Sequence, residues 1–142
     1  MSALSQERNT PQYGVEVLPQ LTNYPVKAGA LLFQGGIAVL NGGWADKGQV
    51  ATGLVALGRI EKTIDNSTGA NGTQNVPVRQ GVFKFGNSAA ADAIALVNVG
   101  SDCFLVDDQT VALTNGGGTR SRAGKIINVE PDGVWVLLGV GL

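Results

Sequence analysis

The stretch ALLFQGGIAVLNGGW, residues 30–44, contains the pattern that decides the fold. Two apolar runs flank Gly35-Gly36, and the second run ends at Asn41-Gly42-Gly43. Short apolar runs bounded by glycine favour β-strands. An Asn-Gly pair readily adopts the positive φ angles of a tight hairpin turn. The stretch therefore predicts short strands joined by a tight turn, with Trp44 capping the core just after it.

The same alternation of apolar runs and turn signals continues on both sides of this stretch. Glycine, which weakens helix interiors but suits turns and bulges, occurs 21 times. Frequent short strands separated by turns indicate an all-β sandwich or barrel. We expect a single compact β-sandwich or β-barrel domain over residues 13–142. Further strands are expected at 49–57, 59–64, 76–85, 104–106, 110–113, 123–129 and 133–138, with turns at Asp107-Asp108, Asn115-Gly116-Gly117-Gly118 and Pro131-Asp132-Gly133.

Three segments carry more specific expectations. In Val76–Phe85 the apolar side chains change face, which predicts a bulge near Gly81, and Pro77 favours an edge strand. Ser88–Leu96 is the one segment that suggests a helical turn, with Ser88 as its N-cap. Asp65–Asn75 has no apolar residue larger than alanine, so we expect an exposed loop.

The single cysteine and the two tryptophans are candidate core residues. Cys103 lies in an apolar run, where a buried and inert thiol is expected. Trp44 and Trp135 suit either a core or a protein interface. Because Val134 and Val136 flank Trp135, the sequence favours the core for that side chain.

Composition limits the classes of partner. The 142 residues suffice for one domain, and only 15% are charged, whereas soluble domains average about 25%. A net charge of -1 gives no basic footprint, so we expect no nucleic-acid partner. The longest apolar stretch, Val134–Leu142, is shorter than the ~18 to 20 residues that span a bilayer, so we expect no membrane partner. Met1–Gln12 lacks the apolar region of a signal peptide, which predicts synthesis in a cytosol without export.

The residues that usually carry chemistry are scarce. Histidine, the commonest general base and transition-metal ligand, is absent from the sequence. Asp107-Asp108 lacks the spacing of a calcium loop and suits a solvated turn. Asn115–Arg120 lacks the pattern of a phosphate-binding loop and suits a hairpin loop. We therefore expect no catalytic residues, no metal, no cofactor and no small-molecule substrate.

Two groups of residues are candidates for binding another protein. Residues 1–12 are polar and have little to bury, so they suit a flexible arm that either binds a partner or frays. The densest group of cations further along the chain suits either a solvated strand face or a patch that docks on an acidic surface. The arm candidates are Ser5, Gln6, Glu7, Arg8, Asn9, Thr10, Pro11 and Gln12, and the cationic candidates are Arg120, Arg122 and Lys125.

Several motifs, in their order along the chain, resemble those of the small head cement proteins of Mu-like and related tailed phages and prophages. The similarity extends from about Tyr13 to Val136, and its order is more specific than any one motif. It also includes Ala28-Gly29-Ala30 and the start of the loop at Asp65–Gly72. The main motifs are Arg79-Gln80-Gly81-Val82-Phe83, Val106-Asp107-Asp108-Gln109-Thr110-Val111, Thr119-Arg120-Ser121-Arg122-Ala123-Gly124-Lys125 and Asp132-Gly133-Val134-Trp135-Val136.

The resemblance implies a single compact β-barrel or jelly-roll-like sandwich with an extended N-terminal arm, made in the bacterial host cytoplasm, that decorates the outer capsid surface of the virion. Its expected partners are the major capsid protein and further copies of itself, as a homodimer or homotrimer. The resemblance provides no catalytic residues. Ser88–Ala95 is richer in alanine than this family leads us to expect. The alternative is a β-sandwich binding module of a phage tail or baseplate, or a carbohydrate-binding domain, which requires exposed aromatic side chains in a groove.

Overall fold

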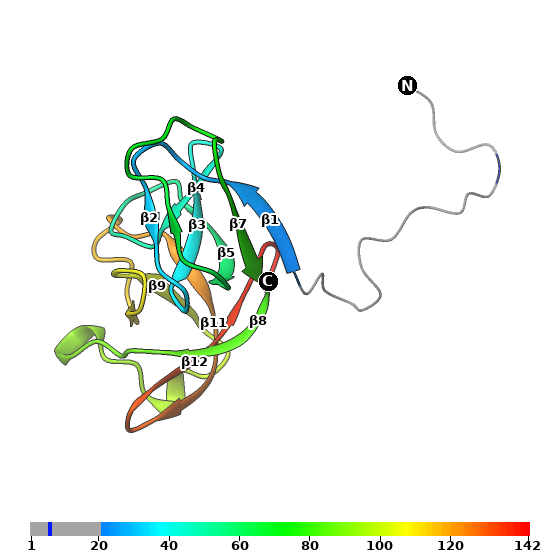
Figure 1. The fold of residues 1–142 in the computed structure, drawn as a ribbon. Coiled ribbons are helices and arrows are strands. Elements are labelled where there is room, and N and C mark those ends of the chain that lie inside the picture. Colours follow the sequence, from blue (N-terminus) through cyan, green and yellow to red (C-terminus); the bar gives the residue numbers. More distant parts are fainter. Residues whose placement is uncertain (1–5, 7–20) are drawn as a thin grey trace.

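The computed structural model describes residue 6 and residues 21–142, and these residues form an all-β fold (Figure 1). The helical segments in this part of the chain are two three-residue 3-10 turns, η1 (Ala90–Asp92) and η2 (Leu96–Asn98). The strands are β1 (Leu21–Pro25), β2 (Leu31–Leu32), β3 (Ile37–Asn41), β4 (Trp44–Lys47), β5 (Val55–Ile60), β6 (Ile64–Asp65), β7 (Asn75–Arg79), β8 (Gly81–Phe85), β9 (Asp102–Leu105), β10 (Val111–Ala112), β11 (Arg122–Glu130) and β12 (Gly133–Leu138).

The strands form three antiparallel sheets. The first sheet has the order β1-β7-β5-β3-β4, the second has the order β10-β9-β11-β12-β8, and β2 pairs with β6 in the third. The two five-stranded sheets share an apolar core, as in a β-sandwich. The all-β expectation is therefore confirmed.

Two predicted hairpin turns are present. Asn41 pairs with Trp44 across the β3–β4 hairpin, and Gly42 and Gly43 have φ angles of 59° and 89°. Two consecutive positive φ angles are what a two-residue turn needs to match the twist of its strands. Glu130 likewise pairs with Gly133 across the β11–β12 hairpin. These turns connect neighbouring strands within one sheet, so they set local register.

The predicted single strand at Val76–Phe85 is instead two strands in different sheets. β7 lies in the first sheet and β8 in the second, so the chain passes between the sheets at Gln80. The edge assignment for Pro77 is also wrong, because β7 lies between β1 and β5. The Pro77 carbonyl accepts a hydrogen bond from the Glu61 amide at 2.9 Å, just beyond the end of β5. Because the N–H and C=O of a strand residue point to the same side, the missing Pro77 N–H removes only one bond at the very end of the β5–β7 ladder.

The core has two parts, one on each face of β3. Ile37 and Val39 belong to the cluster that the two large sheets share. Ala38, between them in the sequence, belongs to a second cluster that includes Leu32 from the small third sheet. All three β3 side chains are fully buried. This burial on both faces explains why the β3 sequence is a continuous apolar run rather than an alternating one.

Two side chains that the sequence places in the core, Cys103 and Trp135, have different outcomes. Cys103 is fully buried, as expected, and burial raises the pKa of its thiol to about 12. Trp135 does not belong to either buried cluster and is half-buried. Because Val134 and Val136 both point into the core, the alternation of a strand places Trp135 on the opposite face. Its indole N–H donates a hydrogen bond to Glu130.

The loop at Asp65–Asn75 is mostly exposed, as expected, but it is organised around one buried side chain. Asn66 is 1% exposed, and its amide donates hydrogen bonds to the carbonyls of Lys27 at 3.0 Å and Ala70 at 3.1 Å. Thr73 donates to the Asn66 amide oxygen at 2.7 Å. The half-buried Trp44 lies beneath this loop, beside Gly72. The buried Asn66 side chain therefore holds this loop together by hydrogen bonds, whereas apolar contacts hold the core together.

Replacing Gly124 with alanine tests the close packing of β11 on β12. A Cβ atom at this position would lie 2.1 Å from the Leu137 carbonyl oxygen, which is backbone and has little freedom to move. We expect Gly124→Ala to lower the free energy of unfolding by about 3 kcal/mol, at the upper end of overpacking costs. The measurement is denaturant unfolding. In the control Gly117→Ala the new Cβ has open space but a φ of 72°, so the expected cost is about 1 kcal/mol. Wild-type stability of Gly124→Ala would contradict this packing.

A candidate protein-binding surface

The predicted binding arm lies almost entirely outside the described residues. Within it the structure describes only Gln6, which is exposed. The arm therefore stays a prediction, and the surface must be built from residues 21–142.

Two of the three predicted cations share one carboxylate. The Arg122 Nε and the Lys125 Nζ each lie 2.8 Å from the Asp102 Oδ1. A regular strand places residues three apart on opposite faces, but the register of β11 against β9 shifts between Arg122 and Gly124. This irregularity allows both cations to reach Asp102. The hydrogen bond from Lys125, followed by that from Arg122, lowers the pKa of Asp102. The trio is partly exposed and keeps a net charge of about +1 when all three groups are ionised.

The third cation, Arg120, belongs to a different cluster. Its Nη1 lies 3.2 Å from the Asp92 Oδ1 and donates to the Thr114 carbonyl at 3.1 Å. Its side chain is only 18% exposed. The three cations predicted to form one patch are therefore divided, and Arg120 connects two loops of the domain.

The segment Asn87–Gly100, which we call the apolar loop, is the most exposed apolar part of the described chain. Leu96, Val97 and Val99 are 64%, 89% and 45% exposed. Asp92 is the one charged residue in the loop, and four of its alanines are also exposed. Single exposed apolar side chains are ordinary, but three within four residues concentrate apolar surface in one place, and such concentrations often mark protein contacts.

The expected helical turn in this segment is only partly correct. The segment forms η1 and η2, which are 3-10 turns, and Ala89 rather than Ser88 precedes η1. Ser88 donates its hydroxyl hydrogen bond to the Val111 carbonyl at 2.9 Å instead of capping a helix. The buried Ile94 anchors the middle of the loop in the core. The turns η1 and η2 on either side of it are therefore too short for an α-helix.

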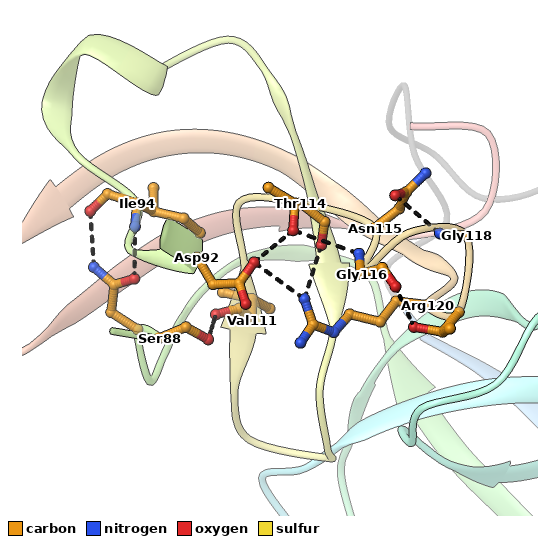
Figure 2. Close-up of polar contacts among 11 residues, drawn as sticks. Ser88, Asp92, Ile94, Val111, Thr114, Asn115, Gly116, Gly118 and Arg120 are labelled. Carbon is orange, nitrogen blue, oxygen red and sulfur yellow. Dashed lines mark hydrogen bonds and ion pairs between the residues drawn. The ribbon is translucent and has the colours of Figure 1, made fainter. Parts of the chain in front are cut away.

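Side chains hold the first half of the apolar loop in one conformation (Figure 2). The Asn87 amide donates to the Ile94 carbonyl at 2.8 Å and accepts from the Ile94 amide at 2.9 Å. Asp92 accepts hydrogen bonds from the Thr114 hydroxyl and from Arg120. The Asp92 carbonyl also accepts from the Leu113 amide at 2.9 Å. These contacts fix the loop to the neighbouring segment 113–120.

The second half is fixed by backbone and amide contacts. The Asn98 Oδ1 accepts a hydrogen bond from the Ala95 amide at 2.8 Å, which closes η2. The Gly100 amide donates to the Ile126 carbonyl of β11 at 2.8 Å. The exposed side chains of Leu96 and Val97 therefore project from a backbone that is fastened at both ends.

The segment 113–120 supports this loop and is not the hairpin loop that the sequence predicts. β10 and β11 flank it, but β9 lies between them in the second sheet. The loop is closed by its own groups: the Gly118 amide donates to the Asn115 Oδ1 at 3.1 Å, and the Thr119 hydroxyl donates to the Gly116 carbonyl at 2.9 Å (Figure 2). Its conformation presents Thr114 and Arg120 to Asp92.

The remaining candidates for chemistry are consistent with turns. Asp107-Asp108 lies between β9 and β10, and the Asp107 carboxylate accepts a hydrogen bond from the Gln109 amide at 2.9 Å. Among the described residues, no three His, Cys, Asp or Glu side chains gather closely enough to hold a metal ion. None of the helical segments in this part of the chain has the length and hydropathy needed to cross a bilayer.

Comparison of the chain with protein-family models, with curated proteins and with solved structures finds no match. The surface must therefore be interpreted from its own geometry. The apolar loop had one signal in the sequence, because Ala93–Gly100 contains no charged residue. The sequence alone did not show that this run lies outside the core.

Removing the Asp92 carboxylate tests whether it fastens the apolar loop. We expect Asp92→Ala to increase amide hydrogen exchange at residues 87–100 by about tenfold, the effect of losing a charge-assisted hydrogen bond. Exchange followed by mass spectrometry measures this change. Asp132→Ala is the matched control, because it removes another ion pair, with Lys84, outside the loop. Unchanged exchange in Asp92→Ala would show that other contacts hold the loop.

The same carboxylate predicts a dependence on pH. Hydrogen bonds from Thr114 and then Arg120 lower the pKa of Asp92 from its ordinary value of 3.8. A lowered carboxyl pKa stabilises the folded state above the unfolded pKa, and this contribution is lost as pH falls through the folded pKa. We therefore expect the Leu96 and Val97 methyl resonances to shift only in acid below pH 3.8. Asp92→Asn should abolish this local transition, and its persistence in that variant would assign it to another group.

Proposed function

We propose that this chain is a head decoration (cement) protein of a tailed bacteriophage, which stabilises the DNA-filled head by bridging major capsid subunits on its outer surface. The resemblance of its ordered motifs to phage head cement proteins supports the phage assignment. The compact barrel or jelly-roll-like domain and the N-terminal arm are part of the same proposal. The all-β fold of the described residues is compatible with it.

The observation that carries the proposal is the exposed apolar loop. Leaving Leu96, Val97 and Val99 in water is unfavourable, and burying apolar surface contributes about 25 cal/mol per Å². Because hydrogen bonds already fasten the loop, the loop loses little conformational entropy when a partner covers it. These properties suit a subunit of a protein assembly.

The capsid contacts in this proposal are the arm, from Ser5 to Gln12, together with Arg122 and Lys125. The two cations keep a net positive charge with Asp102 and are partly exposed, so they suit an acidic capsid surface. Arg120 is better explained as a support for the apolar loop, because it is largely buried against Asp92 and Thr114. Several such weak contacts on one homodimer or homotrimer bind together with high avidity.

This role needs no catalysis. A bridge between capsid subunits adds interfaces that must break before the subunits separate, so binding itself stabilises the shell. We propose that the chain is not an enzyme and that it acts on the outer surface of the virion after synthesis in the bacterial cytoplasm. The lack of histidine in the sequence supports this proposal.

The alternative of a carbohydrate-binding or tail module has weaker support. An open hollow of about 510 Å³ is lined in part by Phe83 and Trp135, and sugars commonly stack on such rings. However, the Arg59 guanidinium lies 4.2 Å from the Phe83 ring centroid, and the Lys84 ammonium lies 5.6 Å from that of Trp135. Both rings therefore already have a cation over one face. We favour the decoration protein.

Deleting residues 2–12 tests the proposed function on mature, expanded heads that lack the protein. We expect the full-length chain to bind these heads in a sedimentation assay and to bind unexpanded precursors poorly, because expansion rearranges the composite capsid sites. The truncated chain should keep its melting temperature but lose most head binding. The double variant Arg122→Ala/Lys125→Ala is the parallel test of the cations.

The controls separate folding from binding. The variant Lys47→Ala removes an exposed lysine outside the proposed contacts and should bind normally. Failure of the full-length chain to bind expanded heads would refute the decoration function. Full binding by the truncated chain would instead exclude the arm and leave the domain surface as the contact.

A further inference from the structure

We infer that the apolar loop of one copy binds in a hollow beside the C-terminus of a second copy. This inference rests on the proposed function, because it names the partner for the loop that carries that proposal. It concerns contacts between copies of this chain, and the arm and Lys125 still provide the proposed capsid contacts, whereas Arg122 also lines the hollow and borders both surfaces.

The hollow, which we call the C-terminal hollow, has a volume of about 200 Å³. Val55 and Val140 are 47% and 46% exposed, so two apolar side chains lie uncovered at this site. Gly139 and Gly141 leave the surface beside Val140 without side chains. The complete lining is Leu54, Val55, Ala56, Arg122, Gly139, Val140 and Gly141.

The volume and lining of the hollow suit an apolar side chain of the size found in the apolar loop. Cavities of about 150 Å³ lined by apolar groups accept benzene, so 200 Å³ has room for the Val97 or Leu96 side chain. Arg122 is the one charged residue in the lining, and Asp102 already neutralises it in part. Covering the hollow with an apolar loop therefore does not bury an unpaired charge.

The start of the apolar loop, at Asn87, and the C-terminal hollow lie near opposite ends of β8, whereas the loop's other end at Gly100 lies two residues before Asp102, which pairs with the hollow residue Arg122. Gly81 pairs with Leu138, which directly precedes the hollow residue Gly139, whereas Phe85 at the other end leads into the apolar loop. Five residues of strand separate these ends by about 13 Å. Figure 1 shows the first part of this loop, the light green segment that follows β8, projecting on the side of the domain away from the C-terminus. Leu96, Val97, Val55 and Val140 are all exposed, so the loop does not fill the hollow of its own copy, and both surfaces remain open to another copy.

A contact between two different surfaces joins copies head to tail. Each copy then uses its loop once and its hollow once, and the series either closes into a ring or continues as a filament. The low surface charge around the loop favours such packing because no like charges have to approach. In a closed ring every copy presents Lys125 in a repeated arrangement, which is the arrangement that multivalent capsid binding requires.

Paired variants test the inference in solution without phage heads. The purified full-length chain should form oligomers by light scattering at roughly tens of micromolar, the range for weak association. Val97→Asp, which places a charge on the loop, and Val140→Asp, which places one in the hollow, should each be monomeric. Val50→Asp is the matched control, because Val50 is also exposed but lies outside both surfaces, and it should remain oligomeric.

Mixing the two monomeric variants gives the decisive result. The Val140→Asp copy keeps its loop and the Val97→Asp copy keeps its hollow, so an equimolar mixture should form dimers and nothing larger. Should Val140→Asp fail to fold by circular dichroism, Val55→Asp replaces it on the other side of the hollow. A monomeric wild-type chain, variants that stay oligomeric, or a mixture that stays monomeric would each overturn the inference. None of these outcomes depends on head binding. The sedimentation assay therefore tests the proposed function separately from this inference.

Discussion

Burial of β3 on both faces is the constraint on which the rest of the described structure depends. Ile37 and Val39 need one apolar cover and Ala38 needs another, so the first sheet cannot have a solvated face along this strand. The second sheet provides one cover and the small third sheet contributes to the other. The chain must therefore cross between sheets, and it does so at Gln80. This crossing starts β8 beside the C-terminus and directs the following loop to the opposite end of the strand.

That loop is apolar but is not part of the core, apart from Ile94, which anchors it. Polar side chains give it a fixed shape in place of apolar packing: Asn87 closes one turn, and Asp92 connects it to Thr114 and Arg120. The same group of ions thus explains why Arg120 does not behave as a surface cation. A rigid apolar surface has a physical use when another protein covers it, and this links the loop to an assembly role.

The sequence predicted features that depend on local chemistry. The Asn41-Gly42-Gly43 turn, the buried Cys103 and the all-β fold follow from turn propensity, apolar context and glycine content, and each is present. Features that depend on distant pairing were missed. The pattern at Val76–Phe85 showed a change of face but not a change of sheet, and the valines beside Trp135 did not reveal which face they occupy. The apolar loop was missed for the same reason, because a short apolar run has the same composition whether the fold covers it or exposes it.

We propose that this domain works as a subunit of a phage head, with its apolar loop buried against protein. A cryo-EM map of the native particle, compared with one of particles made without this chain, tests that claim directly. We expect density for the domain on the outside of the shell that disappears in the second map. We also expect protein density to enclose residues 87–100. Identical maps, or a domain on the shell whose apolar loop faces only solvent, would contradict the proposal.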